Sequence, residues 1–432
     1  MRAVGRHQAT VVAVGIWAGL LVVAIVWGQY LLPGGDLNAP GPPFQGHYRF
    51  SLLSVVPAAL FAVAAALLLP SLASRLRWGP LLGLAWLLAA SWAVLLAAWD
   101  GHRSLGSPIS GRNEYLRAIP MVGDRPVDFL QTFADGVAQR DFPVHVNGHP
   151  PLMVFVYWAW DRVGLVGELW AAALVIGAGS SAVVAVALTL RALGGEGAAR
   201  NVLPFLVLAP FAITVATSAD AFFLAVGAWA AAALTYGVRR GSPVLLASGA
   251  LLTGALPYLS YGLLPLGAIL VVAVVLALRR REERLGPTAV AAVLVGLAVV
   301  PVLMTLGGFW WPDGVVATHR AWALGRGDDR PYAYSFVGDF AVLGVLVGPA
   351  AFAAVARRPR RVVVALAAAS LVGVLSLALS GVTRLEVERI WLPYAPWIVV
   401  VCAALPRSSR CGWLLANALC AVAFQVFVLD AW

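Results

Sequence analysis

The sequence predicts an all-α polytopic membrane protein with about 13 transmembrane helices, and three observations lead to this fold class. Of the 432 residues, 61% are hydrophobic and only 12% are charged. The apolar residues form runs of roughly 20 residues, the length that an α-helix needs to cross the hydrocarbon core of a bilayer. Stretches such as VVALAAASLVGVLSLALS are apolar on every side and offer no face to water. A lipid bilayer is therefore the expected surroundings.

The predicted spans follow one another along the chain and leave two long polar loops between them. They lie at 10–32, 51–69, 80–99, 166–190, 202–218, 219–238, 243–258, 261–278, 287–308, 335–356, 362–380, 390–405 and 411–430. The first run is too long for a signal-peptide core and lacks a small-residue cleavage pattern after it, so we interpret it as a retained span. A single membrane domain is expected, with three N-terminal spans (1–99), a long loop (100–165) and a remaining bundle (166–432) that contains a shorter loop at 309–334.

Arginine positions predict the orientation of these spans. The chain contains no lysine, and its formal net charge is +10. Arginine-rich segments recur at every second loop: Arg2 and Arg6, Arg75 and Arg77, Arg191 and Arg200, Arg239 and Arg240, Arg279 to Arg284, Arg357 to Arg361, and Arg407 and Arg410. Because basic loops stay on the cytoplasmic side, the N-terminus is expected in the cytoplasm and the C-terminus outside. A nucleic-acid-binding face would be contiguous, so no nucleic acid partner is expected.

The acidic residues are distributed unevenly between the two sides. In this orientation 18 of the 30 arginines face the cytoplasm, together with only three acidic residues, Glu196, Glu282 and Glu283, while the other 17 acidic residues face outward. Asp and Glu contribute little to membrane topology. Their concentration outside therefore indicates chemistry or ligand binding at the external ends of the spans.

Two short helices are predicted in the long loop. The stretch 127–139 places Phe129, Phe133 and Val137 on one face at i, i+4, i+8 spacing, which suits a helix lying on the membrane surface. The apolar run LMVFVYWAWDRVG follows the diproline Pro150–Pro151. It is too short to cross a bilayer, so it is expected to form an interfacial or re-entrant helix that the prolines begin.

The same loop supplies the acidic candidates for a catalytic base. Glu114, Asp124 and Asp128 are the candidates that we select for proton abstraction on the external side. Each also has a structural interpretation as a solvated loop charge. Asp128 in addition has the position of a carboxylate at a helix N-terminus.

The motif HVNGHPPL at 145–152 is unusually polar for this chain. His145 and His149 have the i, i+4 spacing of a metal-binding pair, but Gly148 and Pro150 disfavour a helix there, so no metal site is expected. Histidines at this position more often hydrogen-bond a loop carboxylate or a phosphate. We therefore assign His145, His149 and the intervening Asn147 to substrate binding.

Two further external clusters combine arginines with aromatic or acidic residues. In the loop 309–334, Trp310 and Trp311 form either an aromatic belt or a platform for a sugar ring, and His319 and Arg320 follow them. The turn VTRLEVERIW contains Arg384, Glu386, Glu388 and Arg389, which either pair with one another or clamp a phosphate.

The middles of the spans contain almost no ionisable residues. Ion-coupled transporters and pumps need such groups at mid-membrane, so this class is disfavoured. A flippase or transporter of lipid-linked saccharides, which needs a polar path through the bundle, remains the alternative function.

The segment GHPPLMVFVYWAWDRVGLVGELWAAALVIGAGSS resembles the membrane glycosyltransferases of the GT-C superfamily. In those enzymes an acidic external loop leads into a surface helix, a polar stretch often ending in HPPL, a short helix, a glycine-containing break and a span. The segment TSADAFFLA, with Asp220, looks like the family's short external hairpin, and ERIWLPYAPW is similar to its R-Y-L-L-P type segment. The resemblance covers roughly 100–400. Two departures are Asn113-Glu114 in place of an Asp-Glu pair and two additional N-terminal spans (10–69).

The resemblance implies a function and a set of roles. The protein would transfer a sugar, with mannose and arabinofuranose both candidates, from a polyprenyl-phosphate donor to a glycan or glycolipid acceptor with inversion, at the extracytoplasmic face of an actinobacterial plasma membrane. No cofactor is required, and a divalent cation is left open. The assigned residues are Asp128, Asp124 and Glu114 for the base, His145, His149, Asn147, Asp220, Trp310 and Trp311 for substrate, and Arg384, Arg389, Arg320 and His319 for the donor phosphate.

Overall fold

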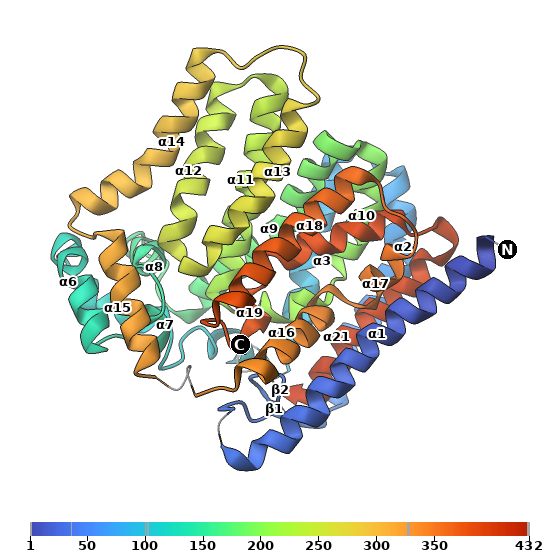
Figure 1. Ribbon diagram of the computed structural model, residues 1–432, viewed down its shortest axis with the longest axis horizontal. Coiled ribbons are helices and arrows are strands. Elements are labelled where there is room, and N and C mark those ends of the chain that lie inside the picture. Colours follow the sequence, from blue (N-terminus) through green and yellow to red (C-terminus); the bar gives the residue numbers. More distant parts are fainter. Residues whose placement is uncertain (1, 36, 100, 102, 326–328, 430–432) are drawn as a thin grey trace.

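The computed structural model describes residues 2–35, 37–99, 101, 103–325 and 329–429, and within them the fold is almost entirely helical (Figure 1). The side chains of Arg2 and Arg6, residues 100 and 102 of the first predicted loop, residues 326–328 of the second and residue 430 of the last predicted span lie outside this description. The all-α fold class is therefore confirmed for the described part of the chain.

The helices and strands follow one another along the chain, and η denotes a 3-10 helix. The first part of the chain forms α1 (Arg2–Leu31), η1 (Leu32–Gly34), β1 (His47–Tyr48), η2 (Leu53–Val55), α2 (Val56–Arg75), α3 (Trp78–Ala97), α4 (Arg103–Gly106), η3 (Tyr115–Ala118), α5 (Ile119–Val122), α6 (Pro126–Gln139), α7 (Val144–Asn147), α8 (Leu152–Arg162), α9 (Glu168–Gly194), α10 (Glu196–Val207) and η4 (Pro210–Thr214). The second part forms α11 (Ala219–Arg240), α12 (Pro243–Leu259), η5 (Tyr261–Leu266), α13 (Gly267–Leu278), α14 (Pro287–Leu306), α15 (Trp311–Ala323), α16 (Tyr332–Val347), α17 (Pro349–Val355), α18 (Arg361–Ser380), α19 (Val387–Ile390), α20 (Ala395–Val399), η6 (Val400–Ala404), η7 (Arg407–Ser409), α21 (Arg410–Phe427) and β2 (Val428–Leu429).

Nine helical segments of the described chain are long and apolar enough to cross a membrane. They are His7–Gly34, Leu53–Arg75, Trp78–Ala97, Glu168–Gly194, Ala219–Arg240, Tyr261–Leu278, Pro287–Leu306, Arg361–Ser380 and Arg407–Phe427. The pair α16 and α17 makes a tenth if it is counted as one span that bends by 91°. The chain is thus a multi-pass helical membrane protein by length and composition, whereas the predicted count of thirteen spans is not confirmed.

The remaining predicted spans are short or broken helices. The predicted span 202–218 is the end of α10 followed by the five-residue helix η4, which begins at Pro210. The predicted span 335–356 breaks at Gly348, whose φ of 76° is followed by Pro349. The predicted span 390–405 contains the last residue of α19 and the short helices α20 and η6. Helix α12 has 17 residues and is slightly shorter than the nine segments given above. Proline lacks the N–H that a continuing helix needs, and hydropathy does not register that loss.

The two predicted loop helices are confirmed as α6 and α8, but the apolar face of α6 has a protein environment. Phe129 and Phe133 contact each other and Phe142, and Phe155 and Phe309 complete the aromatic group. Figure 1 shows α15 beside α6 at this edge of the molecule. The face that suggested a membrane surface therefore packs mainly against other parts of the chain.

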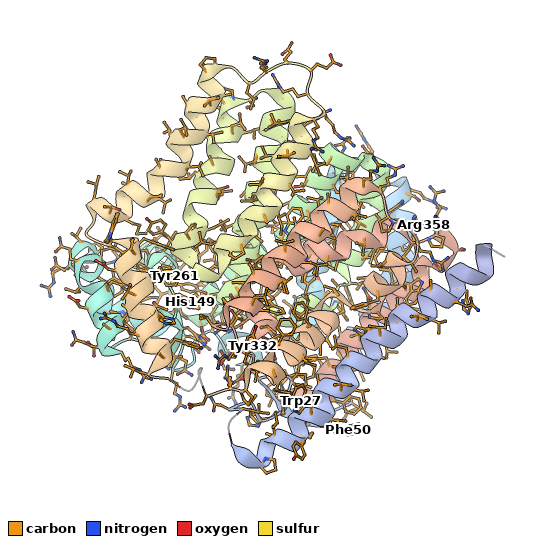
Figure 2. All side chains as sticks on the ribbon, viewed as in Figure 1. Trp27, Phe50, His149, Tyr261, Tyr332 and Arg358 are labelled. Atoms are coloured by element: carbon orange, nitrogen blue, oxygen red, sulfur yellow. The ribbon has the colours of Figure 1, made fainter. Side chains whose placement is uncertain are left out.

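Loop contacts define two ends of the bundle. Helices α9 and α11 both begin at one end of the bundle, which we call the site end. They finish, at Gly194 and Arg240, at the opposite end, which we call the arginine end. Arginine loops meet at the second: Arg200 donates to the Ala73 carbonyl, Arg360 to that of Gly194, and Arg281 to that of Val238. Figure 2 shows His149 and Tyr332 towards the site end and Arg358 towards the other. The arginine loops thus lie together, while the membrane side that they face stays a prediction.

Helices α11, α12 and α14 pack closely because glycines line their contacts. A Cβ atom on Gly254 of α12 would lie 2.5 Å from the Leu297 carbonyl oxygen, and one on Gly296 of α14 would lie 2.5 Å from that of Ala247. Small residues let membrane helices approach closely, and the gain comes from backbone packing. These glycines therefore fix the distance between α12 and α14.

A substitution at this contact is expected to destabilise the protein. Gly254→Ala places a methyl group against rigid backbone, so we expect a loss of about 1–3 kcal/mol, the usual range for overpacking. Gly177→Ala in α9 is the matched control, because its Cβ would meet nothing within 4 Å. It should leave stability unchanged or slightly raised. Thermal unfolding in detergent measures both, and equal midpoints for the two variants would contradict the proposed close contact.

Candidate functional site

Charged side chains from four separate segments gather at the site end, in what we call the charge cluster: Glu114, His145, Asp220, Glu386 and Arg389. Glu114 immediately precedes η3, and His145 lies in the single turn α7. Asp220 lies in the first turn of α11, where a carboxylate interacts favourably with the positive end of the helix dipole. Glu386 and Arg389 come from the turn around α19.

The first ion pair of the cluster joins α11 to α19. Arg389 donates to Asp220 over 3.2 Å, and each side chain is only 4% exposed. A second carboxylate, that of Glu386, lies 3.7 Å from the Arg389 guanidinium. Burying a charged pair costs desolvation energy that its attraction only partly offsets, so such a pair is weak evidence of a stabilising role. A gain in stability alone therefore does not explain the burial of these charges.

The second pair lies between Glu114 and His145. Glu114 Oε1 is 2.7 Å from His145 Nδ1, and both side chains are largely buried. The backbone brings them together, because the His145 N–H donates to the carbonyl of Asn113. The contact fixes the orientation of both groups, and either a carboxylate or a neutral imidazole is able to accept a proton.

Two buried tyrosines lie near these pairs. Desolvation raises the pKa of the Tyr115 hydroxyl well above its usual value, and the nearby Asp220 carboxylate raises it further. The Tyr115 and Tyr157 rings lie 6.4 Å apart, and their buried hydroxyls make no hydrogen bond within the described residues. Buried polar atoms are rarely left unbonded, so two such hydroxyls beside a charge cluster suit a site that binds a polar ligand.

His149 stays neutral at the edge of the charge cluster. Desolvation, followed by the positive charge of Arg389, lowers the pKa of the His149 imidazole to about 3. Its Nδ1 lies 2.7 Å from the carbonyl oxygen of His145, so the neutral ring donates there and keeps Nε2 as an acceptor. Its ring also contacts those of Tyr115 and Phe223. His149 is thus suited to bind a hydroxyl group throughout the physiological pH range.

Two further arginines, Arg330 and Arg384, adjoin the charge cluster through Glu386. Arg330 pairs with Glu386 at 2.8 Å and donates to the carbonyls of Leu37 and Arg384. The Arg384 guanidinium in turn donates to the Arg330 carbonyl and lies over the ring of Trp322, 5.5 Å from its centroid. Arg384 is therefore held by backbone and aromatic contacts beside the cluster.

Glu388, which the sequence places in the same charged turn as Glu386 and Arg389, is almost completely buried. Gln45 donates its N–H to Glu388 Oε1 over 2.8 Å, while Oε2 has no hydrogen-bond partner among the described residues. Desolvation raises the pKa of the Glu388 carboxyl from 4.5 to about 7. Glu388 therefore holds a proton in mildly acidic solution, next to the Arg389 of the charge cluster.

The raised pKa of Glu388 predicts that the stability of the protein depends on pH. Because its folded pKa lies above its unfolded pKa of 4.5, the folded state is favoured less as the pH rises from about 4.5 to about 7. Glu388→Gln removes that ionisation and should raise the free energy of unfolding at pH 8 by about 3 kcal/mol, but very little at pH 4.5. Thermal midpoints of both proteins from pH 4.5 to 8 measure the difference.

The neighbouring Glu386 supplies a control of opposite sign. Despite desolvation, its two arginines Arg330 and Arg389 keep its pKa below the usual value. Its charge thus contributes stability above its unfolded pKa, and Glu386→Gln should lower the thermal midpoint at neutral pH. A gap between the wild type and Glu388→Gln that is constant with pH would contradict the assigned ionisation.

The structure does not bring Asp124 and Asp128 into the charge cluster. The Asp124 side chain is 87% exposed and contacts Arg162, and the Asp128 side chain is 59% exposed and lies 3.4 Å from Arg125. Both lie on the outer surface of the long loop. Of the three acidic residues that the sequence suggested as the base, Glu114 is the one found beside His145.

The residues predicted in the loop 309–334 are spread along α15 and its start. Trp310 is exposed, whereas Trp311 is anchored by donation to the Pro257 carbonyl. His319 stacks on Trp322 at a centroid distance of 5.8 Å, and Arg320 is exposed. Because the Trp322 ring also contacts the Arg384 guanidinium, His319 lies close to Arg384.

Asn147 has a structural role in this region. Its amide nitrogen donates to the Phe142 carbonyl over 2.6 Å, and its own carbonyl accepts from Thr318 of α15. It thus joins the loop that carries His145 to α15. The predicted site residues did not include Tyr115, Tyr157 or Arg330. Of these three, only Arg330 was recognisable from the sequence, because it is an arginine in a predicted external loop, where membrane topology does not require one.

Comparison of the chain with protein-family models, with curated proteins and with solved structures gives no match. Within the described part of the chain, no group of three or more His, Cys, Asp or Glu side chains is arranged to hold a metal ion. A divalent cation therefore stays an open prediction, and the interpretation of the site depends on its geometry.

Proposed function

We propose that the protein is a membrane glycosyltransferase of the GT-C type, which moves a sugar from a polyprenyl-phosphate donor to an acceptor hydroxyl at the extracytoplasmic face. The observation that carries the proposal is the buried Glu114–His145 pair beside the buried Arg389–Asp220 pair, at one end of an apolar helical bundle. A lipid-linked donor needs a site that both the bilayer and the water layer reach. The charge cluster lies among helix ends and loops at one end of the apolar bundle, which supports such a position.

Glu114 is proposed as the general base. The acceptor hydroxyl attacks the anomeric carbon, its proton passes to the Glu114 carboxylate, and the bond from the anomeric carbon to the phosphate oxygen breaks. Attack opposite the leaving group inverts the anomeric configuration. His145 orients the carboxylate through the 2.7 Å contact, and a positioned base of this kind contributes about 10²–10⁴-fold to the rate.

Arg389 is proposed to bind the phosphate of the donor. Polyprenyl phosphate leaves with the bonding electron pair, and its negative charge needs stabilisation by a cation. The guanidinium of Arg389 is fixed by Asp220 and Glu386, so it does not reorganise when charge develops. Arg330 shares Glu386 with Arg389, and Arg384 donates to the Arg330 carbonyl, so both add positive charge on that side of the cluster. The His149 imidazole and the Tyr115 hydroxyl are suited to bind sugar hydroxyls.

A reconstituted assay tests this function against translocation of the donor. The protein in lipid vesicles is given polyprenyl-phosphate-linked mannose or arabinofuranose, radiolabelled in the sugar, together with envelope glycan acceptors. We expect label to appear in the acceptor in step with the release of polyprenyl phosphate. Movement of intact donor between leaflets without its cleavage would instead establish a flippase and contradict the proposal.

A further inference from the structure

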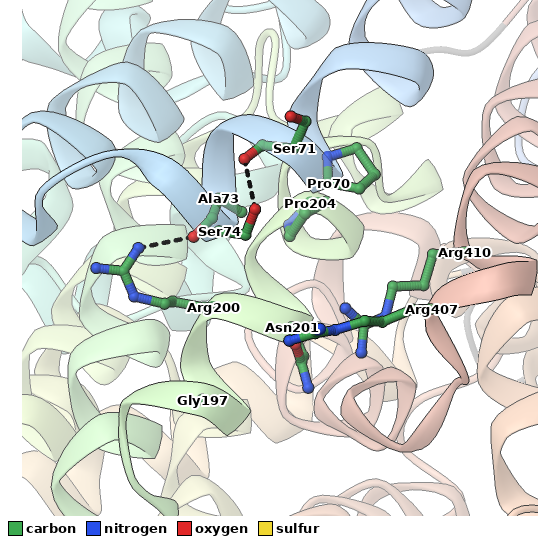
Figure 3. A pocket seen from close by; sticks show the side chains of 10 residues that line it. All are labelled: Pro70, Ser71, Ala73, Ser74, Gly197, Arg200, Asn201, Pro204, Arg407 and Arg410. Carbon is green, nitrogen blue, oxygen red and sulfur yellow. Dashed lines mark hydrogen bonds between the residues drawn. The ribbon is translucent and has the colours of Figure 1, made fainter.

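A polar cavity lies at the arginine end, far from the charge cluster. It has a volume of about 360 Å³ and is lined by Pro70, Ser71, Ala73, Ser74, Gly197, Arg200, Asn201, Pro204, Arg407 and Arg410 (Figure 3). The lining comes from the end of α2, the start of α10, and the segment where η7 leads into α21. These are helix ends, so the cavity lies at the level where the apolar spans finish.

The three arginines of the cavity differ in how their charges are compensated. Arg200 pairs with Glu196 at 2.7 Å and donates to the carbonyls of Ala73 and Leu76. Arg410 donates its Nε to the Leu405 carbonyl, which fixes the side chain but does not neutralise it. Among the described residues, neither Arg407 nor Arg410 pairs with a carboxylate, and no lining residue is acidic.

This arrangement exceeds what membrane topology requires. A cytoplasmic loop needs positive charge, but it does not need two arginines to converge on one cavity. Figure 3 shows Arg407, Arg410 and Asn201 together on one side of the cavity, with Ser71 and Ser74 across from them. Helix α21 begins at Arg410, so its positive dipole end adds to the same region. Two guanidinium groups side by side repel each other unless an anion lies between them.

We propose that this cavity binds a phosphate group, with the Arg407 and Arg410 guanidinium groups and the Asn201 amide as donors. Arginine forks match phosphate oxygens, and hydroxyl and amide groups complete such sites. The source is either the headgroup of an anionic lipid or free phosphate. The position at the ends of membrane helices and the volume, larger than one phosphate group needs, favour the lipid. This phosphate site is independent of the function proposed for the site end.

Thermal stability in nanodiscs of defined composition tests the site. Phosphatidylcholine nanodiscs with and without phosphatidylglycerol are compared, and inorganic phosphate is added to phosphatidylcholine nanodiscs in a separate arm. Phosphatidylglycerol should raise the thermal midpoint of the wild type, because a ligand that binds the folded state stabilises it. Stabilisation by inorganic phosphate alone would identify free phosphate as the source, and no stabilisation by either would overturn the proposal.

Variants assign the effect to the cavity. The double variant Arg407→Gln/Arg410→Gln should lose at least half of the stabilisation, whereas Arg284→Gln, which removes an exposed arginine from another loop, should keep it. Because the Arg407 side chain is exposed, Arg407→Gln alone is expected to fold and to lower the apparent affinity for phosphatidylglycerol at least threefold. Equal responses of Arg407→Gln, Arg284→Gln and the wild type would overturn the proposal, whether or not the double variant folds.

Discussion

Glu114→Gln is expected to lower the transfer rate by about 10²–10⁴-fold, because the amide occupies the same volume but does not accept the proton of the acceptor hydroxyl. The binding of the donor should change little, since the donor phosphate is assigned to Arg389. Single-turnover transfer from a radiolabelled polyprenyl-phosphate sugar measures the rate, and equilibrium binding of the unreactive donor lipid measures the affinity. The effect should therefore fall on the chemical step.

Asp124→Asn and Asp128→Asn are the matched controls for Glu114→Gln. Each replaces an acidic side chain of the same loop that lies on the surface and contacts an arginine. Transfer by these variants should stay within about threefold of the wild type, in keeping with the small worth of exposed ion pairs. If either aspartate variant were inactive while Glu114→Gln kept its activity, that aspartate would be the base and the assignment of Glu114 would be wrong.

Arg389→Met is expected to lower the free energy of unfolding by about 3–5 kcal/mol and to abolish donor binding. The stability loss follows because Asp220 would remain buried as a charge without its partner. The loss of binding follows because the phosphate would lose its principal cation. Thermal unfolding in detergent and binding of polyprenyl phosphate measure the two effects separately.

A second variant separates these two roles of Arg389. In Asp220→Asn/Arg389→Met the uncompensated charge is absent, so most of the lost stability should return. Donor binding should stay lost, because the cation has not been restored. A double variant that regains both stability and binding would show that Arg389 has only a structural role.

The transmembrane helices show what the sequence is able to predict. Helices such as α9 and α14 correspond to continuous apolar runs, and their existence follows from length and hydropathy. The break at Gly348–Pro349 and the shortening of α10 before Pro210 do not follow, because local backbone geometry decides them. A hydropathy criterion counts such segments as full spans.

The charge cluster shows the same limit at the level of single residues. The sequence marks Glu114, His145, Asp220 and Arg389 by their polarity in segments predicted to be external, but it does not show which of them meet. Asp220 and Arg389 are 169 positions apart, and a pair of that separation is created only by the packing of α11 against α19. Asp124 and Asp128 carry the same chemical signal as Glu114, and only burial distinguishes them.

The most direct test of the proposed site is a map of the full chain in nanodiscs that contain polyprenyl phosphate, determined by electron cryomicroscopy. We predict phosphate density within hydrogen-bond distance of the Arg389 guanidinium, near Arg384 and facing Glu114 and His145, with the prenyl chain leading into the bilayer. Phosphate density elsewhere, with the charge cluster closed around its own ion pairs, would contradict the assignment of the donor site.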